Sequence, residues 1–126
     1  MKIDRLDHLV LTVVDVQVTC AFYARVLGME ILTFGEGRKA LGFGGQKINL
    51  HQAGREIEPK AHRATPGSAD ICLIAATPLD EAMAQLAEYG VDLVMGPVEQ
   101  NGATGKIRSV YFRDPDLNLV EISNYL

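Results

Sequence analysis

Four side chains that can bind a metal or carry a proton lie in short, strand-like stretches of this sequence. They are His8, His51, Asp70 and Glu121. Within residues 117–123, an alternating strand puts Glu121 on the face of Leu117 and Leu119, and it is the only charged residue of the stretch. A carboxylate in such surroundings needs a cation, a metal or strong hydrogen-bond donors to stay ionised. We therefore expect Glu121 to have a specific partner.

His8 lies in the β-rich stretch 7–13. Leu9, Leu11 and Val13 share one face of this strand, which we expect a helix to cover, so His8 lies on the other face. A single histidine in a strand is more often structural than a ligand. The case for metal binding therefore depends on the positions of the other three residues.

The elements that position these residues follow the order βαβββ twice. The first unit, about 5–52, has a predicted strand at 7–13, a helix at 16–27 between Asp15 and Gly28, and strands at 29–34, 39–43 and 46–52. A polar loop at 53–68 precedes the second unit, about 69–124. This unit has a predicted strand at 69–75, a helix opened by Thr77 and Pro78 and ended at Gly90, and strands at 91–95, 106–112 and 117–123. The sequence predicts one α+β domain over 1–126.

The repeat relates the four residues to one another. Aligning the first strands of the two units places His8 over Asp70, and aligning residues 48–52 with 118–122 places His51 over Glu121. Potential metal-binding side chains thus fall at two equivalent pairs of positions, which random placement would rarely produce.

Composition favours a small-molecule partner. The chain has 126 residues, 48% of them hydrophobic, a net charge of −4 and an isoelectric point near 5.3. Without a basic cluster, neither nucleic acid nor an anionic membrane is expected as a partner. No signal peptide or membrane span is visible. Cys20 and Cys72 fit no metal spacing, and we expect both to be buried thiols of a cytoplasmic protein.

The motifs resemble those of a known superfamily. The chain is similar to the vicinal oxygen chelate proteins, which include glyoxalase I, fosfomycin-resistance proteins, bleomycin-binding proteins and extradiol dioxygenases. The similarity is greatest to the group called glyoxalase domain-containing protein five, through residues 46–51, 65–70 and 111–116. The superfamily motifs are Asp7-His8-Leu9-Val10-Leu11, Phe22-Tyr23-x-x-Val26-Leu27-Gly28-Met29 and Asp114-Pro115-Asp116-x-Asn118-x-x-Glu121.

This resemblance implies a fold, a site and an assembly. The two βαβββ units would form an open, cup-shaped mixed sheet of the glyoxalase/bleomycin resistance/dihydroxybiphenyl dioxygenase fold. His8, His51 and Glu121 match metal-ligand positions. Asp70 stands where glyoxalase I has a histidine, so it could be a ligand, a base or a hydrogen-bonding neighbour. A homodimer is implied as well.

Two imidazoles and a carboxylate suit one divalent ion, Zn²⁺, Ni²⁺, Co²⁺, Mn²⁺ or Fe²⁺, and leave coordination positions open for a substrate. A substrate with oxygens on adjacent atoms could occupy them, with Glu121 or Asp70 as the base and the metal stabilising an enediolate. We therefore expect glyoxalase-like lyase or isomerase chemistry on a small, vicinally oxygenated molecule.

Two alternatives remain open. The same ligand set activates oxygen at ferrous iron in dioxygenases, although extradiol enzymes are usually longer. Bleomycin-binding relatives instead sequester a drug or metabolite without turnover, and they generally lack this triad.

Overall fold

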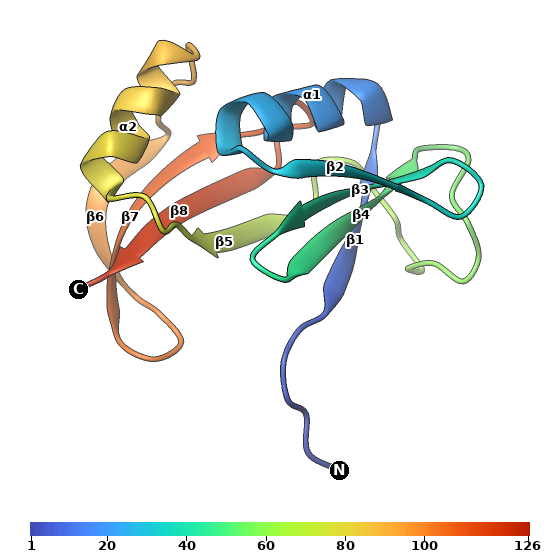
Figure 1. The fold of residues 1–126 in the computed structure, drawn as a ribbon, viewed down its shortest axis with the longest axis horizontal. Coiled ribbons are helices and arrows are strands. Elements are labelled where there is room, and N and C mark those ends of the chain that lie inside the picture. Colours follow the sequence, from blue (N-terminus) through green and yellow to red (C-terminus); the bar gives the residue numbers. More distant parts are fainter. The chain divides into compact units, whose positions relative to one another are not determined.

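A computed structural model describes all 126 residues as two compact units of continuous chain, Met1–Pro66 and Gly67–Leu126 (Figure 1). The first unit contains β1 (His8–Val13), α1 (Val16–Leu27), β2 (Glu30–Phe34), β3 (Arg38–Phe43) and β4 (Gln46–Gln52). The second contains β5 (Asp70–Ile74), α2 (Leu79–Glu88), β6 (Met95–Asn101), β7 (Lys106–Arg113) and β8 (Leu119–Tyr125). The predicted order βαβββ, repeated twice, is confirmed.

Each unit has one open four-stranded mixed sheet. The strand orders are β1-β4-β3-β2 and β5-β8-β7-β6. In both sheets the first and last strands of the unit pair in parallel, and the other neighbours are antiparallel. A parallel pair needs a long crossover connection, which the helix and two strands between them provide.

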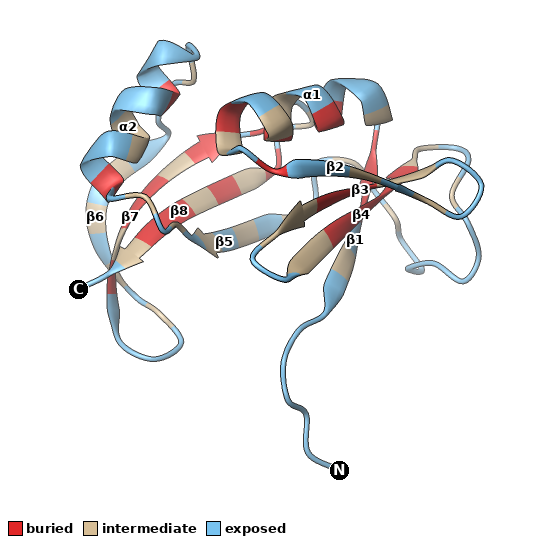
Figure 2. Ribbon diagram, viewed as in Figure 1, coloured by how far each residue is buried: buried red, intermediate tan, exposed pale blue.

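Helix α1 begins and ends where the sequence predicts. Asp15 Oδ1 accepts hydrogen bonds from the backbone N–H groups of Gln17 and Val18, at 2.9 and 3.2 Å. Gly28 ends the helix in the left-handed region, with φ of 66°. The helix contacts β2, β3 and β4, and Figure 2 colours stretches of β1, β3 and β4 as buried. Five apolar residues of these strands are buried on the helix side of the sheet. They are Leu11, Val13, Leu41, Ile48 and Leu50. We call the opposite face of this sheet, and its equivalent in the second unit, the helix-free face.

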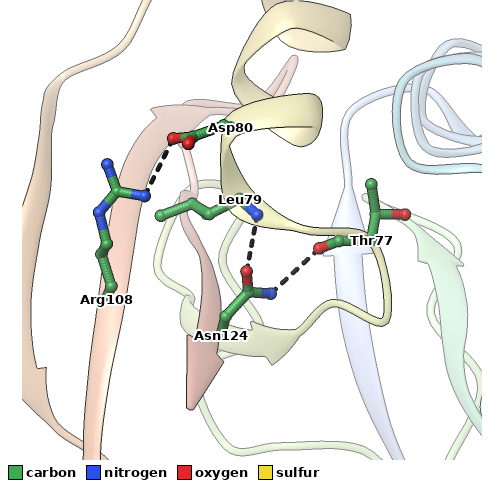
Figure 3. Close-up of polar contacts among 5 residues, drawn as sticks. All are labelled: Thr77, Leu79, Asp80, Arg108 and Asn124. Carbon is green, nitrogen blue, oxygen red and sulfur yellow. Dashed lines mark hydrogen bonds and ion pairs between the residues drawn. The ribbon is translucent and has the colours of Figure 1, made fainter. Parts of the chain in front are cut away.

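Helix α2 is capped from β8 and not from its own sequence. Pro78 is the N-cap and makes no side-chain cap hydrogen bond, so the predicted local cap is wrong. Asn124 Oδ1 instead accepts from the backbone N–H of Leu79 at 2.6 Å, and its Nδ2 donates to the carbonyl of Thr77 (Figure 3). The same Nδ2 also donates to the carbonyl of Ala75. One amide thus satisfies three backbone groups where the chain leaves β5 and enters the helix.

We expect Asn124→Ala to lower the free energy of unfolding by about 2 kcal/mol, because the substitution removes a cap and leaves two partly buried carbonyls without their donor. Urea denaturation measures the change. Asp80→Ala is the matched control. It removes the exposed 3.0 Å ion pair with Arg108 and a negative charge in the first turn of α2 but no cap hydrogen bond, and it should cost less than about 1 kcal/mol. Equal losses in the two variants would contradict the capping role.

The predicted strand at 91–95 is wrong, because β6 runs from Met95 to Asn101. Gly96 and Pro97 lie inside this strand, which is possible because β6 is an edge strand, where a proline is tolerated. The register shifts between Met95 and Val98. Gly96 has φ of 110°, and a Cβ there would lie 2.5 Å from the carbonyl oxygen of Ser109. Only glycine allows this close approach to β7.

Neither helix is long and apolar enough to cross a membrane.

Candidate metal and substrate site

Three rows of side chains cross the helix-free face of the first unit. The pairing register of β2, β3, β4 and β1 defines them. The first row is Glu30, Gly42, Lys47 and His8; the second is Leu32, Ala40, Asn49 and Val10; the third is Phe34, Arg38, His51 and Thr12. Side chains in one row are direct neighbours, and those in the next row are two residues away along each strand.

His8 lies in the first row, opposite Lys47, and is exposed. Its Nδ1 is 2.7 Å from Asp7 Oδ2, and this hydrogen bond is the main reason that the pKa of Asp7 is lowered. A carboxylate on one ring nitrogen fixes the orientation of an imidazole and leaves the other nitrogen available to a metal. His8 therefore has the features of a metal ligand.

His51 lies in the third row, opposite Thr12. It is only 4% exposed, and its Nδ1 has no hydrogen-bond partner. Because a strand rises about 3.3 Å per residue, the rows of His8 and His51 lie about 13 Å apart. The structure therefore does not bring the two predicted histidine ligands side by side within the first unit.

In the second unit, Glu121 lies on the helix-free face between Cys72 of β5 and Tyr111 of β7. Its Oε1 accepts from Ser123 Oγ at 3.3 Å, and Ser123 Oγ is 2.7 Å from Ser109 Oγ, with both serines fully buried. A hydrogen bond from Tyr111 also reaches the carboxylate. The expected specific partners of Glu121 are thus hydroxyl groups of its own sheet.

A cavity of about 500 Å³ opens on this face, and Glu121, Tyr111 and Cys72 line it together with Gln100 of β6. Partial burial is the main cause that raises the pKa of Tyr111, and its hydrogen bond to Glu121 raises it further. The cavity therefore holds an oriented carboxylate beside a phenol that keeps its proton at neutral pH.

Cys72 is exposed, so the prediction that both cysteines are buried is wrong for this residue and confirmed for Cys20. The strand position explains the difference, because Cys72 points to the helix-free face with Glu121. Partial burial of its thiol raises the pKa of Cys72. Its Sγ is 3.5 Å from Ser123 Oγ.

Asp70 is exposed at the first position of β5, opposite Leu119. Since Glu121 is opposite Cys72, Asp70 and Glu121 lie diagonally across two neighbouring strands on the same face. The structure therefore brings the two predicted catalytic carboxylates together.

A buried turn holds these two carboxylates in place. Asp114 accepts hydrogen bonds from the backbone N–H groups of Asp116 and Asn118, at 2.9 and 3.0 Å, and from Asn118 Nδ2 at 2.8 Å. Asn118 Oδ1 in turn accepts from the backbone N–H of Ala69 at 2.9 Å. The start of β5, where Asp70 lies, is thereby tied to the start of β8, which carries Glu121.

The register corrects the repeat alignment by two residues. His8 pairs with Lys47, and its equivalent Asp70 pairs with Leu119. Asn49, rather than His51, therefore corresponds to Glu121, and His51 corresponds to Ser123. A shift of two keeps every side chain on its face, so the alternating pattern did not reveal it. Asn49 was missed, although a lone polar residue between Ile48 and Leu50 was a usable signal.

The structure contains no group of three or more histidine, cysteine or acidic side chains that could hold a metal ion. Within the first unit His8 has a ring nitrogen that Asp7 does not occupy, and within the second unit Asp70 and Glu121 lie on one face. These nitrogen and oxygen donors are the types that divalent first-row metals prefer.

Comparison with known proteins identifies a family and several relatives of this chain. The family model described as Glyoxalase/Bleomycin resistance protein/Dioxygenase superfamily matches residues 5–122. Virulence protein STM3117 of Salmonella typhimurium is 57% identical over all of this chain and 88% of its own length. Glyoxalase domain-containing protein RDO1 of Mycosarcoma maydis is 51% identical over 99% of this chain and 70% of its own.

Solved structures share the fold. The crystal structure of STM3117 superposes with a TM-score of 0.99 and covers 100% of both chains. The fosfomycin resistance protein FosX of Listeria monocytogenes, crystallised with Mn(II) and a sulfate ion, is 22% identical with a TM-score of 0.68 over 99% of this chain and 93% of its own. At that identity the likeness shows the fold alone.

Proposed function

The chain belongs to the glyoxalase/bleomycin resistance protein/dioxygenase superfamily, and on that premise we propose that it is a divalent-metal-dependent enzyme acting on a small, vicinally oxygenated molecule. The observation that carries the proposal is the Glu121 carboxylate, which hydroxyl groups orient in the wall of a cavity large enough for such a substrate. FosX, a member of the same fold, was crystallised with Mn(II), which supports a metal in this one.

Candidate metal ligands lie in each unit. In the first unit His8 presents a free ring nitrogen while Asp7 holds the other. In the second unit Glu121 and Asp70 lie diagonally across β8 and β5 on one face. The metal, when bound, would act as a Lewis acid on the adjacent oxygens of the substrate. His51, predicted as a third ligand, lies two rows from His8 and is tested separately below.

The proposed reaction is proton transfer at a carbon beside a carbonyl group, of lyase or isomerase type. A carboxylate from the Asp70 and Glu121 pair takes the proton as general base. The hydroxyl groups of Tyr111 and Ser123 hold the Glu121 carboxylate in one orientation, which keeps its free oxygen directed at the cavity. This arrangement supports the proposal because a general base must first lie within hydrogen-bonding reach of the proton that it removes.

Elemental analysis tests the proposal, on protein purified without a histidine tag. We expect one divalent metal per chain, and His8→Ala should bind that metal at least about tenfold more weakly, since it removes a ligand. His62→Ala is the matched control, because His62 is an exposed loop residue. A screen of vicinally oxygenated substrates with the identified metal then measures turnover.

Wild-type protein that contains no metal and cannot be reloaded would contradict the proposal and favour a binding protein without turnover. Ferrous iron with air-sensitive activity would favour a dioxygenase over a lyase. The predicted homodimer remains a prediction, and analytical ultracentrifugation measures it.

A further inference from the structure

Three buried side-chain atoms of the chain lack a hydrogen-bond partner, and all three lie on the helix-free face of the first unit. They are Arg38 Nε, Asn49 Oδ1 and His51 Nδ1. Extending the β3–β4 register by one residue beyond Lys39 and Leu50 places Arg38 opposite His51, and Asn49 is in the second row. Each unpaired buried group costs about 1–3 kcal/mol. Their concentration on one face indicates a surface built to bind something.

Two cations adjoin these atoms. The guanidinium Cζ of Arg38 and the Nζ of Lys47 lie 4.8 and 4.1 Å from the centroid of the Phe34 ring. The ring attracts each cation, but the two positive charges repel each other. Neither Arg38 nor Lys47 forms an ion pair. Carboxylates also adjoin this surface: Glu30 lies in the row of Lys47, and Asp7 is hydrogen-bonded to His8 of the same row. Backbone hydrogen bonds of Glu56 and Gly54 lower the pKa of Glu56, and His51 makes a smaller contribution.

A cavity of about 450 Å³ lies on the same face. Leu32, Gly42 and Lys47 line it together with the carboxylates of Asp7 and Glu30. The three unpaired atoms are not part of its wall. Lys47, whose ammonium group also reaches Phe34, belongs both to the cavity and to the pair of cations.

We propose that this face binds a small oxyanion that also carries a hydroxyl group. Arg38 Nε and His51 Nδ1 are donors for the oxyanion, Asn49 Oδ1 is an acceptor for the hydroxyl, and Lys47 adds positive charge. A hydroxycarboxylate and a protonated phosphate group share this pattern. This inference rests on the proposed function. If both hold, the substrate of the enzyme is an anion, and His51 binds that anion and not the metal.

Calorimetric titration of the metal-free protein tests the inference with three probes. Inorganic phosphate and glycolate distinguish the two sources of the oxyanion, and acetate lacks the hydroxyl group. We expect phosphate or glycolate to bind, and acetate to bind more weakly than glycolate. Arg38→Lys keeps the charge but removes Nε, and it should weaken binding at least about tenfold. Arg63→Gln, which removes an exposed cation of the same unit, should leave affinity unchanged.

The inference is wrong if neither phosphate nor glycolate binds, or if Arg38→Lys binds as tightly as the wild type. Metal content separates this result from the proposed function, because the titration uses metal-free protein. We expect His51→Ala to keep its metal and lose anion affinity. Loss of the metal with anion affinity intact would return His51 to the metal site and overturn its assignment here.

Discussion

Glu121→Gln is expected to weaken metal binding at least about 100-fold. Substituting a residue that only hydrogen-bonds to a metal ligand usually costs less. The substitution keeps the size of the side chain and its contact with Ser123, but it replaces an anionic oxygen ligand with a neutral amide. Competition with a chromogenic chelator measures the affinity of the wild type and the variant under the same conditions.

Glu99→Gln is the matched control for this experiment. Glu99 is an exposed residue of β6, and its substitution makes the same change in net charge. The control should bind metal like the wild type. If Glu121→Gln did so too, Glu121 would not be a ligand, and the proposed function would lose the observation that carries it.

Asp114→Ala is expected to lower the free energy of unfolding by about 4 kcal/mol. Asp114 is 3% exposed and accepts three hydrogen bonds, two of them from backbone N–H groups. Alanine would leave these donors buried without an acceptor, which is among the most costly effects of a single substitution. Urea denaturation, fitted with the same m-value for the wild type and the variant, measures the loss.

Two further variants check the cause of that loss. Asp92→Ala removes an exposed carboxylate of the same unit and should change stability by less than about 0.5 kcal/mol. The double variant Asp114→Ala/Asn118→Ala should lose less than the two single losses added together, because the side chains are direct partners. Additive losses would show that the turn is not one cooperative network.

Features that neighbours in the chain determine were predictable from the sequence. Asp15 and Gly28 bound helix α1 because capping depends on groups only a few residues apart. The faces of His8 and Glu121 followed from alternation along single strands. The order βαβββ followed from the same local signals.

Features that depend on distant partners were not predictable. The cap of α2 comes from Asn124, which lies 45 residues beyond Leu79. The register of β4 on β1 decides that Asn49, and not His51, is equivalent to Glu121, and nothing local to β4 reveals it. Strand β6 forms despite Pro97 because its place at the edge of the sheet removes the usual penalty.

The parallel pairing of the first and last strands in each unit also bears on synthesis at the ribosome. When β1 leaves the exit tunnel it has no partner, and it must wait until Gln52 has emerged before β4 can pair with it along its whole length. The intervening helix and hairpin can form earlier, since their contacts are local. The nascent chain therefore carries an unpaired strand edge while elongation proceeds from Val13 to Gln52 in the first half and from Ile74 to Ser123 in the second, a period in which other chains could pair with it.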